Sequence, residues 1–143
     1  MSEEPWASLN VGGGIGDDPA NVAENRRRVL SALGRSQDST YDVWQIHSAQ
    51  ILHADEPRLG PPYPKADGLI TANPDVTLML RFADCVPVML LDPSTPAIGL
   101  IHAGWKGTIL GTVMEGIRAM KHQFGSPPED ILAAIGPAIA GHH

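Results

Sequence analysis

Three runs with the composition of β-strands lie close together in the middle of the chain, and they constrain the fold more than any other feature. They span residues 76–82, 86–91 and 97–102, and the turn residues Asp92 and Pro93 separate the last two. Runs 86–91 and 97–102 are almost continuously apolar, which is typical of strands that are buried on both sides. The sequence therefore predicts a sheet with both faces covered.

Two helices and several shorter elements are predicted around these runs. Asp17, Asp18 and Pro19 suit the start of a helix that runs to about Leu33 and ends at Gly34. The clearest helix is 108–124, where apolar residues recur on one stripe at helical spacing. Shorter elements are strands at 41–46, within ADGLIT (66–71) and at 131–135, and a capped helical turn at 126–129.

The order of helix, strands, helix and strand predicts an α/β fold class of the mixed α+β type, with helices packed on the sheet. The length of 143 residues fits one domain, so we expect a single domain over residues 1–143. Two helices can cover only part of such a sheet. We therefore expect either that some structure is missing or that one face is buried against a partner, such as a second copy in a homo-oligomer.

Charge and cysteine content narrow the classes of partner and location. A net charge of -6 argues against binding to nucleic acid or to an anionic membrane surface. The N-terminal residues lack the apolar core of a signal peptide, and no apolar run approaches membrane-spanning length. Cys85 is the single cysteine, which indicates a reducing compartment, and we expect a cytoplasmic protein.

Three side chains that can ligate a metal stand at the ends of predicted strands. His47 ends one strand in QIH, Cys85 separates two strands in ADC, and His102 ends a strand before AGWKG. Imidazole and thiolate suit zinc or copper, and three protein ligands leave a fourth position open, as in catalytic zinc sites. The separations of 38 and 17 residues are not those of zinc fingers, so only the fold can bring the three together.

Residue types alone leave other interpretations open. Cys85 and His102 can form a pair of nucleophile and base, oriented by Asp84. Alternatively, Cys85 is a small buried apolar residue and the histidines are ordinary surface or hydrogen-bonded groups. Candidates for contacts with a substrate are Lys106, Arg81 and Asp84, with residues 26–28 as a further cationic cluster.

The chain resembles the YfiH-type laccase-domain family, whose members are described as multicopper polyphenol oxidases and as purine nucleoside phosphorylases. The resemblance is carried by SLNVG, VAENRRRVL, QIH, ADGLIT, RFADCVPVMLLDP, IGLIHAGWKGT and IGPAI, from Ser8 to Ile139. ADC followed by HAGW, with QxH upstream, is a highly specific combination. The resemblance implies a mixed α/β sandwich in which His47, Cys85 and His102 bind one metal ion, reported as zinc or copper.

The same resemblance implies an activity. It points to a metal-dependent purine nucleoside phosphorylase that acts on adenosine, inosine and methylthioadenosine with phosphate, and that also deaminates adenosine. A copper-dependent, laccase-like polyphenol oxidase is an alternative, although a multicopper site needs more histidines than the six in this chain. A second alternative is an inactive fragment or interaction module that retains the fold.

The chain also departs from the family pattern. Family members usually have a segment before SLNVG and further strands and helices after GPAI, so we expect a chain truncated at both ends. Part of the core and of the substrate pocket is then absent. Lys106 in HAGWKG stands where the family usually has arginine.

Overall fold

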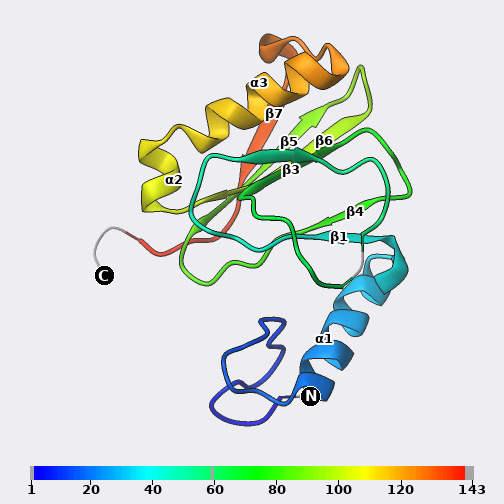
Figure 1. Ribbon diagram of the computed structural model, residues 1–143, viewed down its shortest axis with the longest axis vertical. Coiled ribbons are helices and arrows are strands. Elements are labelled where there is room, and N and C mark those ends of the chain that lie inside the picture. Colours follow the sequence, from blue (N-terminus) through cyan, green and yellow to red (C-terminus); the bar gives the residue numbers. More distant parts are fainter. Residues whose placement is uncertain (1, 59, 141–143) are drawn as a thin grey trace. The chain divides into compact units, whose positions relative to one another are not determined.

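The computed structural model describes residues 2–58 and 60–140, and it divides into two compact units, Met1–Ser39 and Thr40–His143 (Figure 1). The expectation of a single domain over residues 1–143 stays a prediction. No helix within the described ranges is both long and apolar enough to cross a membrane.

The described part of the first unit holds an α-helix, α1 (Pro19–Ala32), which lies where the sequence predicts it, and a short 3₁₀ helix over Gln37–Ser39. The Asp18 carboxylate caps it by accepting a 2.8 Å hydrogen bond from the N–H of the second helical residue. Gly34, with a φ of 67°, follows its end. The buried Asn25 donates a 2.8 Å hydrogen bond to the carbonyl of Asn10, which ties the glycine-rich lead-in to the helix.

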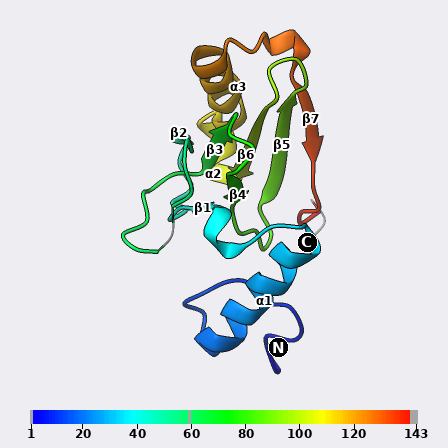
Figure 2. The same ribbon diagram turned by 90° about the vertical axis from the view of Figure 1, so that its right-hand side faces the viewer.

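The second unit is built on a five-stranded mixed sheet with the order β2-β3-β6-β5-β7. β2 and β3 are parallel, and the other neighbours are antiparallel. β7 forms one edge of this sheet (Figure 2). The strands are β2 (Ile51–His53), β3 (Gly68–Thr71), β5 (Val86–Asp92), β6 (Ala97–Ala103) and β7 (Leu132–Ile135).

Two apolar clusters cover opposite faces of this sheet. On one face, Val88, Leu90 and Ile101 pack with Met120 of α3 (Thr112–Phe124). On the other face, a small parallel sheet of β1 (Thr40–Asp42) and β4 (Thr77–Met79) lies over β3 and β6. Its cluster includes Val43, Leu69, Leu80 and Leu100. The mixed α/β class with helices on a sheet is confirmed.

The single helix predicted at 108–124 is wrong at its start. The segment forms two helices, α2 (Trp105–Ile109) and α3, with a break before Thr112. Gly111 adopts a φ of 75° at the break, a backbone conformation that residues other than glycine rarely adopt. The apolar stripe misled the prediction because Ile109 and Val113 keep helical spacing across the break.

Within the described unit, one corner of the sheet is left uncovered, in line with the thin cover expected from two helices. Met89 and Leu91 of β5 and Ile98 of β6 are 46%, 41% and 40% exposed, and Leu132 of β7 is 60% exposed. The register places Leu91 opposite both Ile98 and Leu132, on the face away from α3. β1 and β4 cover this face only over β3 and β6, so an apolar corner faces outward.

Smaller elements differ from the prediction in length and capping. The strands predicted at 41–46 and 76–82 shorten to β1 and β4, three residues each, and the short β2 was not predicted. The turn predicted at 126–129 is a 3₁₀ turn over Pro128–Asp130. Ser126 does not cap it, because Pro127 takes the capping position and supplies no side-chain hydrogen bond.

Candidate metal centre

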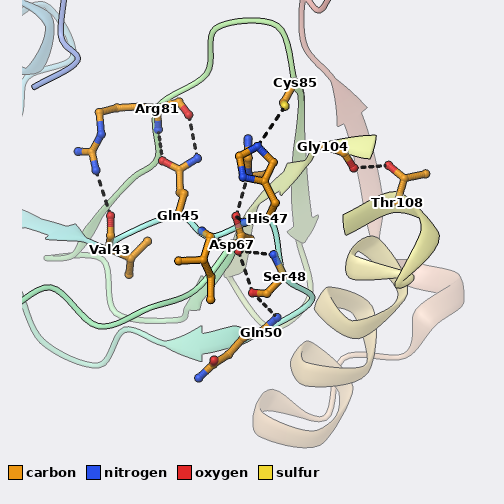
Figure 3. Close-up of polar contacts among 12 residues, drawn as sticks. Val43, Gln45, His47, Ser48, Gln50, Asp67, Arg81, Cys85, Gly104 and Thr108 are labelled. Carbon is orange, nitrogen blue, oxygen red and sulfur yellow. Dashed lines mark hydrogen bonds and ion pairs between the residues drawn. The ribbon is translucent and has the colours of Figure 1, made fainter. Parts of the chain in front are cut away.

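The three predicted ligands come together in the second unit. One ligand atom each of His47, Cys85 and His102 lies within 4.8 Å of the other two, the condition for binding one ion. The Cys85 Sγ is 3.9 Å from the His47 Nε2 (Figure 3). The two imidazole rings stand at 76° with centroids 4.9 Å apart. His102 is buried, Cys85 is half-buried and His47 is exposed.

The antiparallel ladder of β5 and β6 brings Cys85 beside His102. Pro87 pairs with His102, and Val86 pairs with Ala103. Cys85 directly precedes β5, so it lies at the end of the sheet where β6 carries His102. Cys85 and His102 are 17 residues apart along the chain, but they lie side by side at the ends of two paired strands.

His47 owes its position to an unusual backbone conformation. Its φ is 57°, in the left-handed region that residues with side chains seldom occupy. The Asp67 carboxylate accepts hydrogen bonds from the backbone N–H groups of Ile46, His47 and Ser48 at 3.2, 2.9 and 2.6 Å. Successive N–H groups that converge on one anion hold the turn in this conformation.

The same carboxylate orients His102. The His102 Nδ1 lies 2.9 Å from the Asp67 Oδ1, and the His102 backbone N–H donates to the Asp67 carbonyl at 2.7 Å. Because an ionised carboxylate only accepts hydrogen bonds, Nδ1 must carry the proton, which leaves the Nε2 lone pair free for a metal. Such carboxylate–histidine pairs are the usual support of metal-binding imidazoles.

Asp67 is ionised in this setting. Burial disfavours its charged form, since the residue is fully buried, but hydrogen bonds from Ser48, His102 and Ile46 outweigh burial and hold its pKa below the usual range. The carboxylate is therefore a fixed negative charge behind both histidines at neutral pH.

Gly104 keeps the space between the ligands open. A Cβ at this position would lie 2.9 Å from the His47 Cδ2 and 3.0 Å from the Cys85 Sγ, closer than side chains pack. The absent side chain leaves a recess bounded by one imidazole and the thiol. Two imidazoles, one thiol and this recess fit a zinc or copper ion with an open fourth position.

The remaining candidates occupy different surroundings. The Arg81 guanidinium donates to the Val43 carbonyl at 3.0 Å (Figure 3). It also pairs with Asp42 at 2.6 Å, so its charge is already compensated. Lys106 is exposed on α2. Asp84 is exposed and lines an open cavity of about 530 Å³ with Ala83 and residues 137–140. Contacts of these three residues with a substrate stay predictions.

The arginine cluster of the first unit is engaged locally. Arg27 and Arg28 both pair with Glu24 at 2.7 Å on the surface of α1. Arg26 donates through Nε to the carbonyl of Val11 at 2.8 Å. Most of this charge run is therefore used within the unit itself.

Two supporting residues were not predicted for the site: Asp67 and Gly104. Asp67 is the one charged residue of the strand motif ADGLIT, and such a charge beside a buried strand is a signal that sequence reasoning could have used. Gly104 lies within the same short motif as His102. Its role depends on its closeness to His47 and Cys85, which lie far along the chain.

The fold and the side-chain cluster define a mixed α/β protein with a candidate centre of two histidines and one cysteine. The chain belongs to the family described as multi-copper polyphenol oxidoreductase laccase, whose model matches residues 1–143. This confirms the resemblance to YfiH-type proteins that the motifs indicate.

Relatives of known sequence and structure agree with this assignment. The chain is 41% identical over 141 residues to a purine nucleoside phosphorylase of Deinococcus radiodurans, covering 99% of this chain and 53% of the relative. It is 38% identical to one of Streptomyces coelicolor, covering 99% and 58%. The crystal structure of YlmD from Geobacillus stearothermophilus matches with a TM-score of 0.88 at 35% identity, covering 97% and 54%. The chain thus spans about half the length of the curated relatives it matches.

Proposed function

We propose that this chain carries the metal centre of a metal-dependent purine nucleoside phosphorylase. The observation that carries the proposal is the convergence of His47, Cys85 and His102 within 4.8 Å, with Gly104 leaving the space beside His47 and Cys85 free of a side chain. The names of the relatives support a nucleoside and phosphate as substrates.

Zinc is the ion that the donor set suits best, with copper as the alternative. When bound, the ion would supply a Lewis acid and a coordinated water whose pKa is lowered to roughly 7. The residues of the chain set the conditions for that chemistry. Asp67 keeps the proton on the His102 Nδ1, and Cys85 offers a thiolate whose charge partly offsets that of the ion.

The proposed reactions are phosphorolysis and deamination of purine nucleosides. In phosphorolysis, a phosphate oxygen attacks C1′ of adenosine, inosine or methylthioadenosine while the C1′–N9 bond breaks and the purine takes up a proton. In deamination, water adds at C6 of adenosine and ammonia leaves, which gives inosine. Lys106 is the exposed cation nearest in sequence to His102, and it is the proposed phosphate contact. The cavity beside Asp84 is of a size that admits a nucleoside.

The description of the family favours a second candidate, a copper-dependent polyphenol oxidase. Within the described residues, however, His47, Cys85 and His102 form the sole group of three or more histidine, cysteine or acidic residues placed to hold an ion. One such group supports a single ion rather than a multicopper cluster. A third candidate, an inactive fragment that retains the fold, follows from a match to only half of each relative.

A cytoplasmic location and small-molecule substrates complete the proposal. The free thiol of Cys85 favours a reducing compartment, because an oxidised cysteine could not ligate a metal. A homo-oligomer is proposed as one way to cover the apolar corner at Met89, Leu91 and Leu132.

Metal content and turnover of the purified chain test the proposal together. Incubation with adenosine and phosphate should release adenine and ribose-1-phosphate, and deamination should release inosine. His102→Ala should lose both metal and turnover, whereas His122→Ala, at an exposed histidine of α3, should keep both. Absence of bound metal in the wild type refutes the metal centre. Full metal content without turnover identifies the inactive fragment, and oxidation of phenols without phosphorolysis identifies the oxidase.

A further inference from the structure

The segment that ends at Cys85 is joined to the segment that ends at His47 by the side chain of Gln45. The Gln45 Nε2 donates a 2.8 Å hydrogen bond to the Arg81 carbonyl, and the Arg81 N–H donates a 2.8 Å hydrogen bond to the Gln45 Oε1. Figure 3 shows the amide of Gln45 facing the backbone of Arg81 through both contacts. The side-chain amide therefore pairs with this residue as a neighbouring strand would.

This pairing begins where the backbone ladder stops. β1 and β4 pair from Thr40 opposite Thr77 to Asp42 opposite Met79. Gln45 lies three residues beyond the end of β1, and Arg81 lies two residues beyond the end of β4. The amide thus continues the pairing of the two segments into the region that carries the ligands.

The Arg81 side chain reinforces the same connection. Its guanidinium pairs with Asp42 at 2.6 Å and donates to the Val43 carbonyl at 3.0 Å. Arg81 is therefore held to residues 42–45 by its backbone and by its side chain. Cys85 follows four residues later, and His47 follows two residues after Gln45.

The two kinds of ligand have separate supports. Asp67 hydrogen-bonds both the His47 backbone and the His102 ring. The hydrogen bonds of Asp67 reach residues 46–48 and 102, whereas Gln45 and the Arg81 guanidinium hold the segment that ends at Cys85 to residues 42–45. Cys85 is thus held from two sides: the β5–β6 ladder places the residues after it beside His102, and the pairing of Gln45 with Arg81 places the segment before it beside the turn of His47.

We propose that Gln45 is a positioning residue of the metal centre, which sets the Cys85 thiolate at coordination distance from an ion held by His47 and His102. This inference rests on the proposed metal centre. Gln45 acts through Arg81 and does not touch the ion. Without its amide, the two imidazoles keep their support from Asp67, while the thiolate is held less closely and contributes less to binding.

The side-chain chemistry makes the requirement specific to glutamine. An amide both donates and accepts, which the Arg81 carbonyl and N–H demand. Glutamate at this position would set a carboxylate oxygen against the carbonyl oxygen of Arg81. Asparagine is shorter by one methylene group and does not span the same gap.

Cobalt substitution tests the inference, because thiolate ligation to Co²⁺ gives a charge-transfer absorption in the near ultraviolet. Wild type should show this band, and chelator competition should give its Co²⁺ affinity. Gln45→Ala and Gln45→Asn should bind Co²⁺ about 10- to 100-fold more weakly, with a reduced thiolate band. Gln123→Ala, at an exposed glutamine of α3, is the matched control and should behave as wild type.

The outcomes separate this inference from the function on which it rests. If wild type binds no Co²⁺, the metal centre itself is refuted. If wild type binds Co²⁺ with a thiolate band and both Gln45 variants match its band and affinity, only the role of Gln45 is overturned. A purely structural role would lower the thermal stability of the metal-free variants without changing the thiolate band. If Gln45→Ala does not fold, the more conservative Gln45→Asn carries the same comparison.

Discussion

The Oδ1 atom of Asp67 accepts hydrogen bonds from the Nδ1–H of His102 and from the backbone N–H of His47, each at 2.9 Å. The other oxygen accepts from the Ser48 N–H and hydroxyl at 2.6 and 2.8 Å. One buried carboxylate thus couples two candidate ligands that lie 55 residues apart in the sequence. Its loss should disturb both at once.

Asp67→Asn replaces one acceptor oxygen by an amide donor, which then faces groups that also donate. We expect a loss of about 3 kcal/mol in the free energy of unfolding of the metal-free protein, because buried N–H groups lose their charged partner. Metal affinity should fall about 10- to 100-fold, since the His102 ring is no longer oriented. Urea unfolding and chelator competition measure the two effects. Asp75→Asn, at an exposed aspartate, should change neither, and equal behaviour of the two variants would contradict the role of Asp67.

The contribution of Asp67 to stability should depend on pH in the acid range. Burial opposes its ionisation, but hydrogen bonds from Ser48 and His102 hold its pKa below the unfolded value of about 3.9. A group with a depressed folded pKa stabilises the fold above its unfolded pKa, and this stabilisation is lost as the pH falls through the folded pKa. The difference in free energy of unfolding between wild type and Asp67→Asn should therefore be constant near neutral pH and should become smaller on acidification. If this difference grows as the pH falls, the ionised carboxylate is not the form of Asp67 that stabilises the fold.

Cys85→Ser separates the ligand role of the thiol from the nucleophile role. A serine hydroxyl is a poor ligand for zinc or copper, so metal affinity should drop by about 100-fold and turnover should be lost with the metal. Metal analysis and nucleoside turnover on the same preparation measure both. If the variant keeps its full metal content and loses turnover, Cys85 acts as a nucleophile and the ligand assignment is wrong.

Sequence reasoning found the three candidate ligands because their chemistry is local to each residue type. Histidine and cysteine at predicted strand ends are recognisable as possible metal ligands without knowledge of how the strands pair. The motifs around them identify the family. The contacts of Asp67 and Gln45 were not found because their partners, His102 and Arg81, lie 35 and 36 residues away. Only the pairing of β3 with β6 and the end of the β1–β4 ladder create those contacts.

The same distinction explains the errors in the fold. The N-terminal helix was predicted well because its start and end signals are local. The break at Gly111 was missed because apolar spacing continues across it. Incomplete cover of the sheet was expected, but its location at Met89 and Leu91 was not, because strand composition reports how apolar a face is and not which neighbour covers it.

Gly104→Ala tests whether the recess between the ligands is where an ion binds. The backbone at Gly104 is extended, with φ and ψ of -74° and 170°, so alanine meets no conformational strain there. The new methyl would instead crowd the His47 ring at 2.9 Å and the Cys85 Sγ at 3.0 Å. His47 is exposed and its ring can turn away, so the stability of the metal-free protein should change by less than about 1 kcal/mol. A displaced ring cannot ligate, and metal affinity should fall at least about 10-fold.

Gly13→Ala is the matched control, because its new Cβ would meet only the Nη2 of Arg26 at 3.7 Å, an ordinary contact. If Gly104→Ala binds metal as tightly as Gly13→Ala does, the ion does not occupy this recess, and the three side chains meet for another reason.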